Sequence, residues 1–206
     1  MHFWIAKYIP RTFTAVEIKK MLNAFKGDTF YEIRNRCIIS LFFSTGIRMN
    51  ELIELKLQDI NITTDLIRIQ KGKGMKERFV PISRAMKRIL IEYLKHRQEY
   101  LADKNPDCPY VFPSRTGQKM TSSALESMFK KLKHELNLQG EKISCHTWRH
   151  TFAKNYLLNG GDIFSLQKIL GHADLESTRI YLQLNDQEIK TQFSRYNPLD
   201  NKDWLY

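Results

Sequence analysis

The sequence predicts a mainly α-helical protein with one small three-stranded antiparallel β-sheet between its helices. Three observations lead to this fold class. Apolar residues recur at helical spacing over most of the chain, helix-capping sequences precede several of these runs, and the spacing changes to alternation between residues 59 and 82. The 206 residues, of which 42% are hydrophobic, suffice for one large domain or two small ones with a proper core.

Three helices are expected before residue 59. The capping box Thr14-Ala15-Val16-Glu17 begins a helix that should continue to about Phe25. The strongly apolar run from Thr29 to Ser44 is typical of a central core helix, in which Cys37 would be core packing. Thr45-Gly46 should end it, and a short third helix follows.

The sheet should consist of three short strands, centred on residues 60–62, 66–69 and 79–82. The glycine-bearing segment 71–76 would form a hairpin tip between the second and third strands, and a long helix should run from about Ser83 to Ala102. Nine basic residues stand against two acidic ones between residues 71 and 97, which predicts a face that meets phosphates.

The second half of the chain should again be helical. A loop over Asp103–Gly117, with a strand-like stretch at 110–112, leads to a helix from about Ser122 to Leu138 that Gly140 ends. Two further helices up to Leu170 should be separated at Asn159-Gly160-Gly161, with one polar cluster on their sides away from the core. From residue 185 only weak periodicity remains, at Ile189 and Phe193, and Pro198 with the polar residues after it predicts a flexible end.

The charge of the chain predicts a polyanionic partner. Its 33 Lys and Arg against 22 Asp and Glu give a formal net charge of +11, which favours nucleic acid first and an anionic membrane surface second. An ordinary basic soluble protein remains an alternative on charge alone. Three scattered cysteines indicate no disulfide framework and a reducing, cytoplasmic compartment. No apolar run approaches the ~20 residues of a membrane span, so a soluble protein is expected.

The chemistry-bearing residues gather between residues 145 and 184. Arginine and histidine side chains beside a tyrosine, in a chain this basic, suggest a site that holds a phosphate and attacks it; these are His146, Arg149, His150, His172 and Tyr181. Taken singly, each has an ordinary structural explanation. His146 and His150 stand four apart like zinc ligands on a helix, but the Glu of an H-E-x-x-H motif is absent. No metal site is expected.

The combination resembles the tyrosine recombinase (phage integrase) family. That family's signature is Arg, Lys, His-x-x-Arg, His or Trp, and Tyr, in this order. The matching positions are Arg48 in TGIRMNEL, Lys73 in GKGMKER, His146 and Arg149 in HTWRH, His172 in LGH, and Tyr181. The resemblance covers about residues 10–184 and implies the mainly helical catalytic-domain fold of DNA breaking–rejoining enzymes over residues 1–184.

The resemblance implies a transesterification at a DNA phosphodiester. Arg48 and Arg149 would grip the non-bridging oxygens as planar forks, and His172 would add a third donor. Tyr181 would be the nucleophile, forming a 3′-phosphotyrosine, and His146 the general base or proton-positioning group. Because the bond energy stays in the protein–DNA link, neither ATP nor a metal cofactor is expected.

The resemblance also implies roles for further residues in protonation, positioning and DNA binding. Lys73 would protonate the leaving 5′ oxygen, and Glu51 would hold an active-site Arg or His through a hydrogen bond. Contacts to DNA are expected from Lys71, Lys76, Arg78 and His150. Rival readings are a type IB topoisomerase-like enzyme and a non-cutting DNA-binding protein on the same fold.

The resemblance also bears on assembly. The partner would be double-stranded DNA, on which the protein would form a homotetramer, while the free protein would be a monomer or weak oligomer. The tail, residues 185–206, would pack into a neighbouring subunit or else be disordered. Many family members carry an N-terminal clamp domain, so this chain is either a fragment or a naturally short member. A bacterial or phage-type, nucleoid-associated protein is expected. The DNA site and the outcome, whether integration, excision, inversion or dimer resolution, are not legible in the residues.

Overall fold

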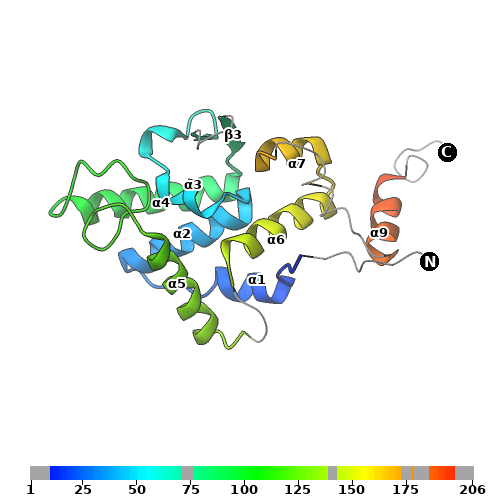
Figure 1. Cartoon of the computed structure of the whole chain (residues 1–206), viewed down its shortest axis with the longest axis horizontal. Helices are drawn as coiled ribbons and strands as arrows, with labels where there is room; N and C mark the ends of the chain where they lie inside the picture. The colour runs from blue at the N-terminus through cyan, green and yellow to red at the C-terminus, as the bar shows by residue number, and fades with distance from the viewer. Residues whose placement is uncertain (1–9, 71–76, 139–142, 173–177, 179–185, 198–206) are drawn as a thin grey trace, which may run out of the picture.

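The computed structural model describes residues 10–70, 77–138, 143–172, 178 and 186–197. Within these residues the predicted fold class is confirmed, because the elements are mainly helices with one small three-stranded antiparallel sheet (Figure 1). The elements are α1 (Ala15–Leu22), α2 (Phe30–Thr45), α3 (Met49–Glu54), the 3-10 helix η1 (Leu57–Asp59), β1 (Ile60–Asn61), β2 (Leu66–Ile69), β3 (Arg78–Pro81), α4 (Arg84–Leu101), α5 (Ser122–Glu135), α6 (Cys145–Leu158), α7 (Ile163–Leu170) and α9 (Asp186–Tyr196).

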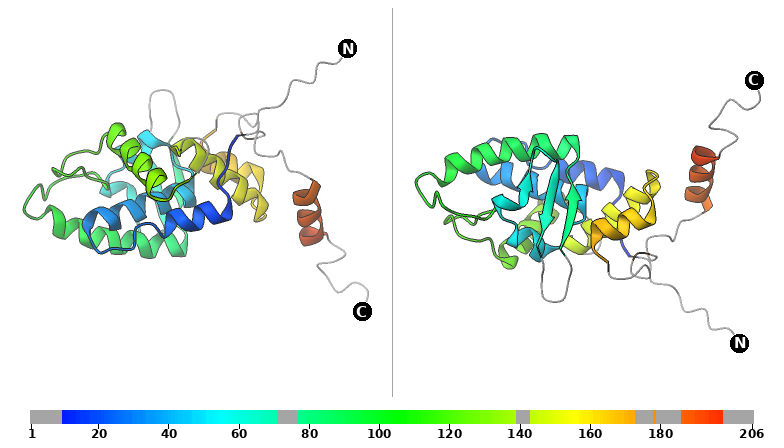
Figure 2. Two further views of the ribbon diagram at one scale, coloured as in Figure 1. Left: turned by 90° about the horizontal axis from the view of Figure 1, so that it is seen from below. Right: turned by 90° about the horizontal axis from the view of Figure 1, so that it is seen from above.

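Helix α2 is the centre of the fold. Thr29 caps its N-terminus, and Gly46 ends it in the left-handed conformation at φ 62°, which glycine adopts without steric cost. Both α4 and α6 pack against it, and Cys37 is completely buried, as predicted. In the right-hand view of Figure 2 the strands lie on the face turned to the viewer, with helices behind and beside them.

The sheet has the strand order β1-β2-β3 and is antiparallel throughout. Ile67 of β2 stands opposite Ile60 on one side and Val80 on the other, and Ile69 stands opposite Arg78. Ile67, Ile69 and Val80 are buried in the same core cluster as residues of α2 and α4. This register places the first residue of β3 at the end of the sheet from which segment 71–76 continues.

A second, smaller core cluster lies between α6 and α7. It consists of Phe152, Ala153, Leu157, Leu166 and Leu170. Asn159 caps α6 and Gly160 takes φ 91°, so the predicted break between the two helices is confirmed.

The predicted basic face is wrong at Arg97. Only 4% of this residue is exposed, and its guanidinium donates to the carbonyls of Cys108, Tyr110 and Val111. Arg97 thereby supplies hydrogen-bond donors to the carbonyl groups of the loop that follows α4. In the same loop Val111 donates its N–H to the Leu55 carbonyl across 2.8 Å. A buried arginine can take this place because five donors serve several carbonyls at once.

Two helix ends and one additional helix differ from expectation. Helix α1 ends at Leu22 rather than Phe25. Helix α5 ends at Glu135, where the C-cap Leu136 bonds back to the helix and Asn137 takes φ 46°; Gly140 lies outside the described residues. Asp186–Tyr196 form α9, where the sequence shows only weak periodicity, and the flexible end predicted from Pro198 lies outside the described residues. The sequence pattern missed this helix because its apolar residues are few and exposed, as at Ile189 and Phe193.

In the part of the chain with described positions, no helix combines the length and apolar character needed to cross a bilayer.

Candidate active site

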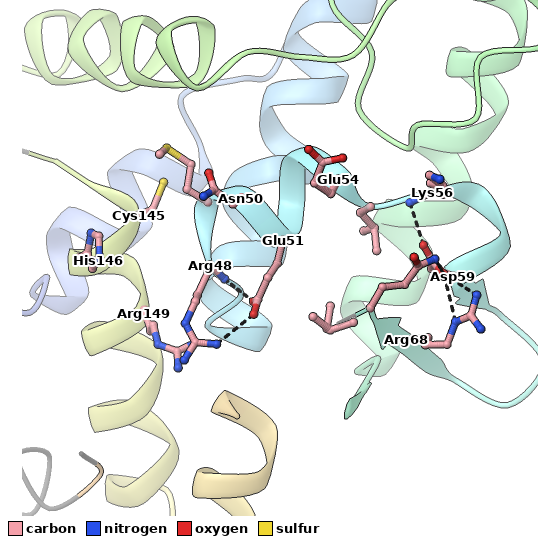
Figure 3. A pocket seen from close by; sticks show the side chains of 14 residues that line it. Arg48, Asn50, Glu51, Glu54, Lys56, Asp59, Arg68, Cys145, His146 and Arg149 are labelled. Carbon is pink, nitrogen blue, oxygen red and sulfur yellow. Dashed lines mark hydrogen bonds and ion pairs between the residues drawn. The ribbon is translucent and has the colours of Figure 1, made fainter. Parts of the chain in front are cut away.

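The N-terminal ends of α3 and α6 and the end of β2 line one pocket of about 670 Å³ (Figure 3). Four of its lining residues are predicted site residues: Arg48, Glu51, His146 and Arg149. The sequence separates the first two from the last two by roughly half the chain, and the packing of α6 on α2 brings them together.

Arg149 is buried, with 6% of its surface exposed. Its Nη1 donates to the Gly46 carbonyl across 2.8 Å and its Nη2 to the Leu170 carbonyl across 2.7 Å. These two carbonyls belong to the C-terminal ends of α2 and α7, where the helix dipole is negative and offsets part of the cost of burying the charge. The expectation that the polar cluster lies away from the core is therefore wrong for Arg149.

The packing around Arg149 explains why glycine stands at positions 46 and 171. Gly46 and Gly171 end α2 and α7 in the left-handed conformation, at φ 62° and 66°. A side chain at Gly46 would also collide with Phe152, whose nearest atom lies 2.6 Å from the Cβ position. The two turns thereby allow both helix ends to meet Arg149 closely.

Arg48 lies at the entrance of α3, with 32% of its side chain exposed. The Glu51 carboxylate accepts from its backbone N–H across 2.8 Å and from its Nη1 across 2.9 Å. Its Nη2 donates to the Gly171 carbonyl at 3.3 Å. Arg48 is thus fixed on one side while it remains accessible from the pocket.

Glu51 is a nearly buried carboxylate between two arginines, Arg48 and Arg78. Burial alone would raise the pKa of Glu51, but hydrogen bonds and charge from Arg78, followed by hydrogen bonds from Arg48, lower that pKa to about 2. Glu51 is therefore ionised at neutral pH. The hydrogen bond expected from Glu51 to an active-site arginine is present at Arg48.

The two histidines of α6 differ in position. His146 lines the pocket with Arg48 and Arg149. His150 is half-buried, and burial, followed by the charges of His146 and Arg149, lowers the pKa of its imidazole, which favours the neutral form at pH 7. Among the described residues no group of three His, Cys, Asp or Glu side chains could hold a metal ion.

His172 follows directly after the glycine that ends α7. Its Nδ1 lies 2.8 Å from the hydroxyl oxygen of Thr178, a completely buried residue. The hydroxyl of Thr178 thereby fixes the orientation of the imidazole ring. Thr178 is not among the predicted site residues, and the only feature of the sequence that points to it is its position three residues before Tyr181.

Not all predicted residues can be placed. Tyr181, Lys71, Lys73 and Lys76 lie outside the described residues. Arg78 is described, but its side chain is only 10% exposed and is bound to Glu51 and to the Ile169 carbonyl. The structure thus gives Arg78 a place inside the protein rather than on an open surface.

Comparison with known proteins shows to which family the chain belongs. A family model described as the phage integrase family matches residues 11–188. The chain belongs to this family. It is 31% identical over 192 residues to tyrosine recombinase XerD of Halalkalibacterium halodurans, covering 93% of this chain and 63% of the relative. It is 32% identical over 197 residues to tyrosine recombinase XerA of Pyrococcus furiosus, covering 96% and 65%. The chain spans just under two thirds of the length of these relatives.

Solved structures of phage integrase family members share the fold. A crystal structure of XerA recombinase superposes with a TM-score of 0.79 at 32% identity, covering 93% of this chain and 66% of that one. XerH recombinase bound to a palindromic difH substrate gives 0.74 at 27% identity, covering 92% and 54%. The catalytic domain of bacteriophage HP1 integrase gives 0.62 at 23% identity and is covered over 98% of its length, which shows the fold alone. The predicted tyrosine recombinase catalytic-domain fold is confirmed.

Proposed function

We propose that residues 1–184 are the catalytic domain of a site-specific DNA recombinase that cuts and rejoins DNA through Tyr181. The observation that carries this proposal is the convergence of Arg48, His146 and Arg149 on one pocket, with His172 following the turn that both arginines contact. Two arginines fixed at a single cavity are suited to hold one phosphate and the negative charge that develops on it during attack, and the histidine beside them can accept a proton.

Each donor has a distinct place in this chemistry. Arg48 is accessible and held by Glu51, so it can offer its remaining guanidinium edge to a non-bridging oxygen. Arg149 stabilises negative charge in the pocket from a buried position. Its burial excludes water and thereby strengthens its electrostatic field at the pocket. His172 donates from Nε2 while Thr178 holds Nδ1.

The proposed reaction exchanges one phosphodiester for another. The Tyr181 hydroxyl loses its proton to His146, its oxygen forms a bond to phosphorus, and the bond from phosphorus to the 5′ oxygen breaks. Lys73 gives that leaving oxygen its proton. Rejoining is the reverse step with the 5′ hydroxyl of another strand, so strands are exchanged without net hydrolysis, ATP or metal. Tyrosine is a demanding nucleophile because its free pKa is about 10, so a base beside it is needed.

Double-stranded DNA is the proposed partner. The net charge of +11 favours a polyanion, and the related XerH recombinase was solved with a DNA substrate bound. Lys71, Lys76 and His150 are proposed contacts to the DNA. A protein with this partner would act in the cytoplasm of a bacterium, at the nucleoid.

The tail, residues 185–206, is proposed to link subunits of a homotetramer on DNA. Its helix α9 exposes Ile189, Phe193 and Tyr196, with relative exposures of 52%, 67% and 50%. Polar contacts join the same helix to α6 of its own chain, where Gln192 donates to the Leu157 carbonyl. An amphipathic helix held by few contacts and carrying exposed apolar residues is suited to pack against a second copy.

A suicide-substrate assay tests the proposed chemistry. The protein is incubated without metal with nicked duplexes of candidate sites and compared with Tyr181→Phe on a denaturing gel. We expect a covalent protein–DNA adduct that requires Tyr181. Binding to a preferred site without any adduct would favour the non-cutting alternative. Adducts with relaxation of supercoils but no exchange between two marked sites would favour the topoisomerase-like one.

A further inference from the structure

Arg78 occupies a junction between three segments of the site. It is the first residue of β3 and pairs with Ile69, so it stands where the two strands leave the sheet toward segment 71–76. All three nitrogens of its guanidinium are used inside the protein. Nη1 and Nη2 donate to the two Glu51 oxygens across 2.7 and 2.8 Å, and Nε donates to the Ile169 carbonyl across 2.8 Å.

The contact with Glu51 fixes a carboxylate that in turn fixes Arg48. Both Glu51 oxygens receive one hydrogen bond from each arginine, so the carboxylate cannot rotate without breaking the fork from Arg78. A planar guanidinium provides this fork, whereas a lysine ammonium supplies only a point charge. The orientation of Arg48 therefore depends on Arg78 through Glu51.

The other side of Arg78 supports the turn before His172. A Cβ at Gly171 would lie 2.8 Å from the Arg78 Cδ and 3.1 Å from its Nη1, so the glycine backbone packs directly on this side chain. The Gly171 carbonyl also accepts from the Arg48 Nη2. The Leu-Gly-His motif thus needs its glycine both for the backbone conformation and for the close approach to Arg78.

We propose that Arg78 is a positioning residue, which holds Glu51 and the turn at Gly171 together so that Arg48 and His172 present their donors to the same phosphate. This inference rests on the proposed function, since that function supplies the phosphate. It differs from a contact between Arg78 and DNA, because the side chain is only 10% exposed and already donates to three acceptors inside the protein.

The test compares Arg78→Met and Arg78→Lys with Arg36→Met. Arg36 is a matched control, because it also donates to a glutamate, Glu92 across 2.6 Å, and to a backbone carbonyl, that of Phe25. At saturating DNA we expect the single-turnover cleavage rate of Arg78→Met to fall by about 10²-fold, the effect of a small misplacement of catalytic groups. Arg78→Lys should be intermediate, and Arg36→Met should cleave like the wild type.

DNA binding separates positioning from a phosphate contact. Removing a contact to a phosphate lowers the slope of log affinity against log salt concentration by about 0.9. We expect the slope of Arg78→Met to equal that of the wild type. A reduced slope combined with an unchanged cleavage rate at saturation would overturn the proposal and make Arg78 a DNA contact.

A measurement on the free protein makes the result independent of activity. The pKa of the Glu51 carboxyl, followed by carbon NMR, should rise from about 2 in Arg78→Met and stay low in Arg36→Met. The other ionisable groups that line the Glu51 pocket remain in both variants; they are Arg48, Glu54, Lys56, Asp59, Arg68, Cys145, His146 and Arg149. An unchanged Glu51 pKa in Arg78→Met would contradict the proposal.

The variants also keep the two proposals apart. If the wild type forms no adduct on any substrate, the proposed function fails, while the Glu51 titration still decides whether Arg78 anchors that carboxylate. If Arg78→Met does not fold, Arg78→Lys decides. It keeps the charge that lowers the Glu51 pKa but lacks the fork, so slow cleavage with a low Glu51 pKa supports the proposal and wild-type cleavage overturns it.

Discussion

The imidazole Nδ1 of His172 lies 2.8 Å from the hydroxyl oxygen of Thr178, which is completely buried. For His172 to donate from Nε2, its Nδ1 must either accept a proton from Thr178 or, in the imidazolium, donate one to it. A hydroxyl can serve in both ways because it is donor and acceptor. The pair therefore keeps His172 oriented as a donor in either charge state.

Replacing Thr178 by valine should impair this donor. Val has nearly the shape of Thr but cannot bond to Nδ1, so the imidazole is no longer held. We expect the single-turnover cleavage rate of Thr178→Val to fall by about 10²-fold, the low end for losing one transition-state donor, with DNA affinity unchanged. Thr178→Ser should restore most of the rate, and equal rates in the valine and serine variants would contradict the role of the hydroxyl.

Even the substitution of Arg149 by lysine should lower the cleavage rate and the stability of the protein. Lysine keeps the charge but cannot serve the Gly46 and Leu170 carbonyls as a fork while it also faces a phosphate. We expect Arg149→Lys to lose about 10²–10³-fold in cleavage rate. Its unfolding free energy, measured by urea denaturation, should drop by about 1–3 kcal/mol, because one buried carbonyl loses its partner. A variant as stable as the wild type would show that the ammonium reaches both carbonyls.

Gly171→Ala should combine two costs, a strained backbone at φ 66° and a collision with Arg78. The left-handed conformation alone costs about 1–2 kcal/mol for a residue with a Cβ. Gly117→Ala is the matched control, because Gly117 also has a positive φ, 76°, but lies in the loop before α5. Both variants should lose thermal stability, whereas only Gly171→Ala should lose cleavage activity at saturating DNA.

The low pKa of Glu51 should be visible in the acid stability of the protein. The folded pKa, about 2, lies below the ordinary value of 4.5, so the contribution is fully present above pH 4.5 and is lost as the pH falls toward 2. This contribution is on the order of 3 kcal/mol, as the shift of the pKa implies. Glu51→Gln should therefore show a flatter dependence of unfolding free energy on pH in this window, and an unaltered slope would refute the assignment.

The exposed apolar residues of α9 should matter for assembly rather than for folding. Phe193→Glu places a charge where an apolar contact with a second copy is proposed, so we expect fewer multi-subunit complexes on DNA in a gel-shift assay. Ser194→Glu adds the same charge at an exposed neighbouring position of α9 and should assemble normally. Thermal unfolding of the two variants should agree. Equal assembly of both variants would show that Phe193 is not part of an interface.

The sequence predicted best what is encoded locally. Thr29 and Gly46 mark the ends of α2 because a capping hydroxyl and a left-handed glycine act within one turn of the chain. The alternation of apolar residues likewise predicted β2 and β3. Helix α9 escaped because a helix with an exposed apolar side lacks the continuous stripe by which periodicity is recognised.

The site itself could be predicted as a set of residues but not as a geometry. No local pattern shows that Arg149 is buried, since its acceptors are carbonyls of residues 46 and 170. The place of Arg78 depends on the register of β3 and on contact with α7, so a basic residue beside a lysine-rich segment was expected on the surface. Thr178 has a role only once His172 folds back onto it.

Arg149 donates to the ends of both α2 and α7, so local unfolding of α7 should abolish catalytic activity. Helix α7 belongs to the smaller of the two described core clusters, which has five buried residues, so we expect it to open at lower cost than the larger core. Whenever it opens, Arg149 loses one acceptor, Arg48 loses the Gly171 carbonyl, and the segment leading to His172 departs with the helix. Activity should therefore disappear on heating before the larger core melts, and hydrogen exchange of the α7 amides would report the fraction of molecules able to react.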